Sequence, residues 1–198
     1  LGLVFFASEG LTQGSNESIP YTNLPGAIMA TIYTIGYEGT DIDRFVATLQ
    51  AVGIRRIADV RAVALSRKKG FSKKGLATRL QAAGIDYIHF VSLGDPKPGR
   101  DAARAGQYKR FRAIYSKHLG SEDAQASFRE LLDVAGEKPT CLLCFERDPV
   151  TCHRSIVAEE MNEFGFEVLN LYGDDPARYA RNAHRLPRHH SRQGAAAA

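Results

Sequence analysis

The sequence predicts an α/β fold, a single three-layer domain in which helices wrap a mostly parallel sheet of about five strands. Two observations carry this prediction. Short runs rich in β-branched and apolar residues alternate with segments of helical apolar spacing, at the intervals of βαβ units. The chain of 198 residues, with 44% apolar and 24% charged residues, is of a size and composition typical of one globular domain.

The elements follow one another in strand–helix order. The run 31–35 is β-rich and is stopped by Gly36, and 41–52 has helical spacing and is closed by Gly53. The next strand is expected at 54–60, followed by a long basic loop at 61–72. A helix at 73–83, closed by Gly84, then leads to a third strand at 85–91.

The second half continues the alternation after a break. Pro96 and Pro98 interrupt the segment 92–106, so a second long loop is expected there. Helices follow at 107–119 and 123–135, then a buried strand at 139–145, a helix at 155–164 and a last strand at 167–171.

The two ends of the chain differ in composition from the middle. Residues 1–28 are expected to be an upstream extension, either disordered or left by a misplaced start or a vector, and 29–180 the α/β domain. Residues 181–198 are expected to form a disordered tail that is basic and ends in four alanines. The apolar opening 1–7 lacks a basic leader, so export is not expected.

The composition also indicates the cellular environment in which the protein is expected to work. No apolar run reaches the roughly 20 residues that cross a bilayer, so a soluble protein without membrane association is expected. Three cysteines, an odd number, do not make a disulfide framework and favour a reducing cytoplasm. We expect no cofactor, and the oligomeric state is not predicted.

The net charge of +4 conceals an uneven distribution. Residues 55–79 hold nine Lys and Arg against one acidic residue, and 97–117 hold seven against one. Residues 121–167 reverse this, with eleven acidic residues against four basic. A basic face built from the middle of the chain suits a phosphorylated small molecule or nucleic acid. A solvated surface with charges shared between helices explains the same pattern equally well.

Polar residues recur where the expected strands end. Because the carboxyl ends of parallel strands meet at one edge of a sheet, these residues are expected to line a common cleft. They are Tyr37 and Glu38, Asp59 and Arg61, His89, and the group Glu146, Cys152, His153 and Arg154.

Several of these motifs together resemble domain-of-unknown-function family 488. They are Thr34-Ile35-Gly36-Tyr37-Glu38-Gly39, Asp59-Val60-Arg61 with Ser66, Tyr87 to His89 with Leu93-Gly94, and Leu143-Cys144-Phe145-Glu146 with Cys152-His153-Arg154. The resemblance covers about 31–173. It implies an α/β fold with a site at the motif-bearing edge and no settled activity. Similar proteins carry a proline where this chain has Ala62-Val63-Ala64-Leu65.

The cysteines allow more than one interpretation. Cys152 is expected at or just before a helix N-terminus beside His153 and Arg154, a setting that favours a thiolate. A small semi-buried residue at the helix start is an equally good explanation. A metal site on Cys152 and His153 is a weaker alternative. Cys141 and Cys144 are expected to be core fillers, because strand residues three apart point to opposite faces.

The favoured interpretation is an enzyme, a hydrolase or transferase, acting on a nucleotide or nucleic acid. Its catalytic candidates are Glu146, Cys152, His153, Glu38 and Asp59. Its anion- and substrate-binding candidates are Arg154, Arg61, Tyr37, Gly36, His89 and Ser66. The alternative is a non-catalytic nucleotide or nucleic-acid binding module that uses the same basic cleft, with the basic loops 61–74 and 97–112 around it. A small interaction domain stays open as a third class.

Overall fold

The computed structural model describes residues 30–187, and the expected extension 1–28 and most of the expected tail lie outside the described residues. Its sheet has five parallel strands in the order β3-β2-β4-β1-β5, which confirms the predicted α/β class. The strands are β1 Thr31–Gly36, β2 Arg56–Asp59, β3 Asp86–His89, β4 Thr140–Cys144 and β5 Glu167–Tyr172.

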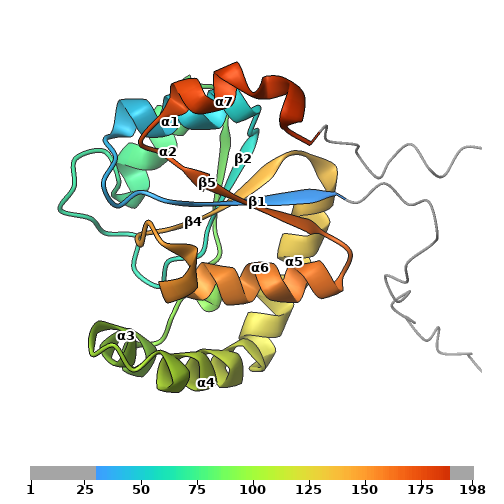
Figure 1. Cartoon of the computed structure of the whole chain (residues 1–198). Coiled ribbons are helices and arrows are strands. Elements are labelled where there is room, and N and C mark those ends of the chain that lie inside the picture. Colours follow the sequence, from blue (N-terminus) through green and yellow to red (C-terminus); the bar gives the residue numbers. More distant parts are fainter. Residues whose placement is uncertain (1–29, 188–198) are drawn as a thin grey trace, which may run out of the picture.

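Helices cover both faces of the sheet, so the domain has the three layers that the sequence predicts. Helices α1, α2 and α7 lie on one face, and α5 and α6 lie on the other, with α3 and α4 beyond α6 (Figure 1). Their bounds are α1 Ile42–Val52, α2 Lys73–Ala82, α3 Lys97–Arg104, α4 Tyr108–Leu119, α5 Glu122–Glu137, α6 His153–Glu163 and α7 Pro176–Arg181. None of these helices is long and apolar enough to cross a bilayer.

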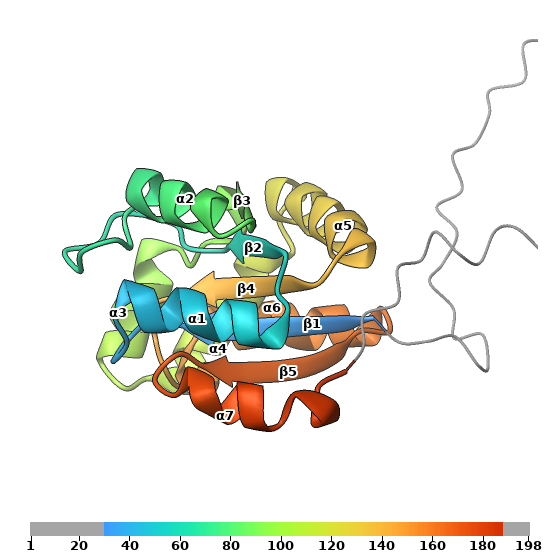
Figure 2. The ribbon, with the colours of Figure 1, turned by 90° about the horizontal axis from the view of Figure 1, so that it is seen from above.

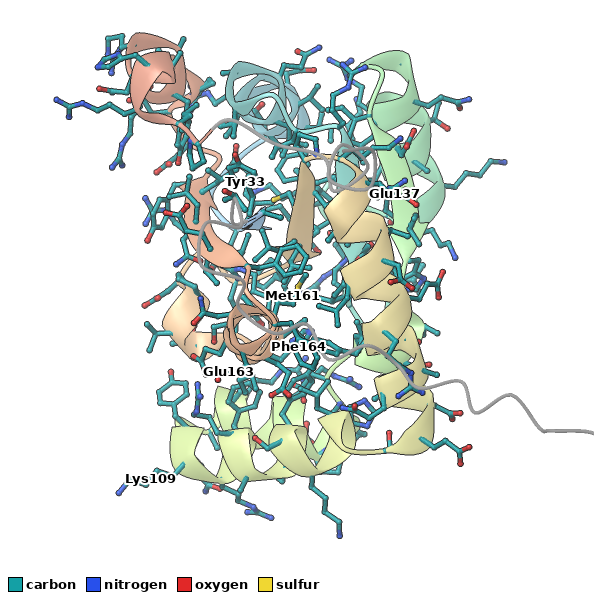
Figure 3. All side chains as sticks on the ribbon, turned by 90° about the vertical axis from the view of Figure 1, so that its right-hand side faces the viewer. Tyr33, Lys109, Glu137, Met161, Glu163 and Phe164 are labelled. Carbon is teal, nitrogen blue, oxygen red and sulfur yellow. The ribbon has the colours of Figure 1, made fainter. Side chains whose placement is uncertain are left out.

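The central strands β1 and β4 are buried along their whole length, because helices cover both of their sides. Alternate residues enter different cores. Ile32 packs with the α4, α5 and α6 side chains, whereas Tyr33 packs with those of α1, α2 and α7. In Figure 3, Met161 lies between α6 and the sheet while Lys109 of α4 points away from the molecule.

The predicted ends of helix α1 agree with the structure, because a capping residue marks each of them. Asp41 caps α1 by accepting hydrogen bonds from the N–H groups of Asp43 and Arg44, at 3.0 and 2.8 Å. Gly53 ends the same helix in the left-handed conformation, as expected.

The prediction of a long loop at 92–106 is wrong, because α3 occupies its middle. Pro98 lies in the first turn of α3, where its missing N–H has no partner to lose, so it begins a helix instead of breaking one. Helix α7 was also missed, and it too has a proline in its first turn, Pro176. The described structure continues past residue 180, and the Tyr33 hydroxyl donates to the Pro187 carbonyl.

Helix α3 and the basic loop 61–72 lie on the side of the sheet toward which the strand arrows point (Figure 2). Gly94, just before α3, passes so close to the backbone of Ala62 that a β-carbon would lie 2.2 Å from its Cα atom. This contact joins the start of the basic loop to the segment that leads into α3.

Candidate functional site

A cavity of about 710 Å³ opens at the carboxyl edge of the sheet, between the basic loop 61–72, α3 and the β4–α6 loop. This is the edge at which the sequence predicts a cleft. Five predicted site residues line it, namely Tyr37, Arg61, Ser66, Glu146 and His153. It is also lined by polar and charged residues that were not named individually as site candidates, namely Arg67, Lys68, Asp95, Lys97, Arg100, Asp101, Arg104 and Cys144.

Two predicted ligand-binding residues position the wall that carries Glu146. Arg154 is fully buried, and its guanidinium donates to the carbonyl of Glu146, to that of Arg147 at 3.0 Å and to the Thr34 hydroxyl at 3.3 Å. Gly36 leaves room for the same loop, since a β-carbon there would lie 1.7 Å from the Glu146 carbonyl oxygen. Neither residue lines the cavity, so the geometry gives both a positioning role.

Asp59 and Arg61 form a buried ion pair beside the cavity. The Asp59 carboxylate accepts from Arg61 Nε at 2.8 Å and from its terminal nitrogen at 2.5 Å, and the Tyr87 hydroxyl donates to it at 2.5 Å. Burial lowers the pKa of Arg61, but the hydrogen bonds and charge of Asp59 outweigh it and raise that pKa. Arg61 also donates to the carbonyl of Phe71 at 2.9 Å.

Tyr37 connects this pair to the opposite wall. Its ring stacks on Phe71 with centroids 4.4 Å apart, and its hydroxyl accepts from Arg61 at 3.2 Å. The ring of Phe145 meets it edge-on at 5.3 Å and is 44% exposed. The aromatic face open to a ligand is therefore that of Phe145, whereas the ring of Tyr37, a predicted substrate-binding residue, is buried.

The other predicted residues lie apart from the cavity or at its margin. Glu38 is exposed and accepts from the N–H of Arg147 at 2.9 Å, which ties two loops together. His89 Nε2 lies 2.8 Å from the carbonyl of Arg61. Ser66 lines the cavity, and its hydroxyl accepts from the N–H of Lys68 within the basic loop.

Cys152 lies at the N-cap of α6, as expected, but its surroundings do not favour a nucleophile. The residue is 1% exposed, and burial raises the pKa of its thiol well above the usual value. Cys144 differs from the predicted core filler. Its thiol donates to the Glu146 carboxylate at 3.1 Å and lies 3.8 Å from His153 Nδ1, whereas Cys141 is buried in the core on the opposite face.

Two carboxyl groups of the cavity have pKa values displaced in opposite directions. Burial raises the pKa of Asp95 to about 6, and the Glu146 charge adds to this effect. Burial also acts to raise the pKa of Glu146, but hydrogen bonds, the largest from Cys144, lower it overall. At neutral pH, Glu146 is thus a carboxylate, whereas Asp95 holds its proton far more readily than an exposed aspartate does.

Asp95 is the cavity carboxyl group that sequence reasoning missed, whereas the cations around it lie in the basic segments 61–74 and 97–112 that the binding-module alternative places at the cleft. Asp95 follows Leu93-Gly94, a motif already noted, and Oδ1 of Asp95 has no hydrogen-bond partner within 30–187. Arg100 donates to the Asp95 carbonyl, which holds this residue against α3.

Replacing Asp95 by asparagine is expected to stabilise the protein at pH 7.5 by about 1–3 kcal/mol and to change stability little near pH 4. The folded-state pKa of Asp95 is about 6, above the usual 3.8, so stability falls as the pH rises through this interval and stays lower above it. The amide does not ionise and escapes this loss. Urea unfolding at both pH values measures the difference.

The buffer for this comparison contains a chelator, because a bound cation changes nearby carboxyl pKa values. Asp101→Asn is the matched control. Asp101 is exposed and pairs with Lys97, whose hydrogen bond lowers its pKa, so this variant should show no gain at pH 7.5. If Asp95→Asn were no more stable than the wild-type protein at pH 7.5, the raised pKa assigned to Asp95 would be wrong.

These features place the protein among the open parallel α/β proteins that carry a cavity at the carboxyl edge of the sheet. A family model described as "Domain of unknown function DUF488" matches residues 41–161, and the chain belongs to that family. The match confirms the family to which the resemblance pointed, and it spans Asp59, Asp95, Glu146 and Cys152. No curated protein and no solved structure matches the chain.

Proposed function

We propose that this protein is an enzyme that hydrolyses, or transfers a group from, a nucleotide or nucleic acid bound in the carboxyl-edge cavity. The observation that carries the proposal is the combination of a basic rim with a buried carboxyl group, Asp95, and a half-buried one, Glu146, whose pKa values are shifted in opposite directions. The rim consists of Arg67, Lys68, Lys97, Arg100 and Arg104, which come from the basic loop and from α3. Cations on two sides of a cavity of this size suit a phosphorylated ligand.

The two carboxyl groups supply complementary chemistry. Glu146 suits the role of general base, because its lowered pKa keeps it ionised at neutral pH, and Asp95 suits that of general acid, because its pKa of about 6 keeps a fraction of it protonated near neutrality. Environments that push two pKa values apart are a recurrent way to assign an acid and a base within one site. His153 lines the same cavity, and its positive charge acts to lower the pKa of both carboxyl groups.

A base or sugar has an apolar surface to contact. Phe145 is 44% exposed at the cavity, and Val63 and Leu65 of the basic loop are 55% and 76% exposed. Stacking on an exposed aromatic ring is a general way to hold a nucleobase without reading its identity. This supports a nucleotide or single-stranded nucleic acid over a simple phosphate ester.

The test uses a panel of nucleotides and a labelled single-stranded oligonucleotide, with binding followed by fluorescence anisotropy and products by chromatography. Arg67→Met with Arg104→Met should weaken binding roughly tenfold and flatten its salt dependence. Glu146→Gln should keep binding and lower the turnover by about 100-fold or more. Lys109→Met, an exposed cation outside the cavity, is the matched control.

The alternative, a binding module, gives a different result. It predicts tight binding that falls with salt, no product from the wild-type protein, and no effect of Glu146→Gln. Failure of the rim variants to weaken binding of any probe would count against both functions.

A further inference from the structure

Three side chains that commonly bind transition metals meet beside the cavity. They are Cys144 at the end of β4, and Cys152 and His153 at the start of α6. Their ligand atoms, the two Sγ atoms and a ring nitrogen, all lie within 4.8 Å of one another, and all three residues are buried. They come together because the eight residues between Cys144 and His153 turn back on themselves.

That turn is held by contacts that do not involve the three side chains. Arg154 binds the carbonyls of Glu146 and Arg147, and the Asp148 carboxylate caps the short helix at 149–151 by accepting from the N–H of Val150 at 3.0 Å. The sulfur and nitrogen atoms are therefore brought together by the backbone, before any ion binds. Preformed ligands lose little freedom on binding, which favours affinity.

The distances between the three ligand atoms suit an ion with tetrahedral coordination. With Zn–S near 2.3 Å and Zn–N near 2.0 Å, neighbouring ligand atoms of a tetrahedral site lie roughly 3.6–3.8 Å apart. Cys144 Sγ and His153 Nδ1 are 3.8 Å apart, and no pair in the group exceeds 4.8 Å. Shifts of an ångström or less, within the reach of side-chain rotation, would complete the geometry.

The imidazole of His153 is oriented as metal-binding histidines usually are. Its Nε2 atom lies 2.7 Å from the carbonyl of Val60, which only accepts hydrogen bonds, so Nε2 carries a proton and donates. The atom that faces the two sulfurs is then Nδ1. A backbone carbonyl that orients the far nitrogen in this way is a standard outer-shell partner of a ligating histidine.

A fourth position faces the cavity. Cys144, His153 and Glu146 all line it, and the Glu146 carboxylate lies 3.1 Å from Cys144 Sγ. Cys141 is excluded from the set, because its side chain lies in the core on the other face of β4. The ligands are thus not the Cys141-Cys144 pair that a CxxC pattern would indicate, which explains why sequence spacing gave a weak signal.

We propose that Cys144, Cys152 and His153 bind one Zn²⁺ or similar divalent transition ion, with the fourth position open to Glu146 or a water molecule from the cavity. Two thiolates and one imidazole match the preference of zinc for sulfur and nitrogen. On binding, each thiol releases one proton to solvent. The proposal does not rest on the proposed nucleotide chemistry, because metal binding is measured without turnover.

The test uses the full chain, reduced and stripped with a chelator. Titration with Co²⁺ should saturate at one equivalent and give sulfur-to-cobalt charge-transfer absorption with the visible bands of a tetrahedral ion, and Zn²⁺ should abolish both. X-ray absorption of the zinc form should show two sulfur atoms near 2.3 Å and nitrogen or oxygen near 2.0 Å. Binding should weaken as the pH falls, because protons compete for the ligands.

Cys144→Ala and Cys152→Ala should lose the charge-transfer absorption and the rise in Tm caused by Zn²⁺, whereas Cys141→Ala, a matched change in the same strand, should keep both. If the two variants fail to fold, X-ray absorption of the wild-type protein still decides. A spectrum with nitrogen and oxygen only, no saturable Co²⁺ binding, or a Cys144–Cys152 disulfide that persists under reducing conditions would overturn the proposal.

Discussion

Arg154→Met is expected to lower the free energy of unfolding by about 3–5 kcal/mol, because it removes a buried charged donor from three acceptors at once. The guanidinium is fully buried and bonds the carbonyls of Glu146 and Arg147 and the Thr34 hydroxyl. Methionine fills much of the volume but leaves the two carbonyls without this donor. Chemical denaturation of the wild-type and variant proteins measures the difference.

Arg112→Met is the matched control for this loss. Arg112 pairs with Glu159 on the surface, where the two side chains are 46% and 56% exposed, so its removal should cost less than about 1 kcal/mol. The comparison also separates two roles for Arg154. A variant that keeps the wild-type unfolding free energy yet loses affinity for phosphorylated probes would restore the anion-binding role predicted from the sequence.

Asp59→Asn is expected to cost a similar amount, about 3–5 kcal/mol, because it leaves the Arg61 charge buried without its counter-ion. The Asp59 side chain is fully buried and that of Arg61 is 5% exposed. Asparagine keeps the size of the side chain and part of its hydrogen bonding but lacks the negative charge. Urea denaturation at neutral pH tests this expectation.

A double-mutant cycle with Arg61→Met sharpens the test. Removing both charges should cost much less than the sum of the two single changes, since an uncompensated buried charge is the main penalty in Asp59→Asn. Additive losses would show that the pair is not coupled in the way its geometry indicates. Asp101→Asn, which breaks the exposed pair with Lys97, provides the surface reference.

The order and type of most elements could be predicted from the sequence because each depends on signals close along the chain. Apolar spacing marks α1, and Asp41 and Gly53 mark its ends, so the predicted and observed helices differ by one residue. Helix α3 was missed for the opposite reason. Its apolar pattern is short, and a proline at this position is also typical of a loop. In the structure, α3 packs against α4, a contact that lies beyond local sequence signals.

The candidate site, like the fold, could be predicted from the sequence only in part. That polar residues gather at strand ends could be predicted, because parallel strands of an α/β sheet end at one edge. Which of these polar residues face the cavity could not be predicted from the sequence. Arg154 and Asp59 have the charges of binding and catalytic groups, yet the tertiary structure uses them to hold a loop and to neutralise Arg61.

The sequence by itself determined the fold class, the sheet edge at which a cavity lies and the family, because periodicity and ordered motifs are properties of the chain. Only the tertiary structure decided which side chains meet. It placed Asp95 beside the basic rim and brought Cys144 to His153, although nine positions separate the two in the chain. The physical reason is that burial, pKa and ligand geometry depend on distances in space, which segments far apart in sequence set together.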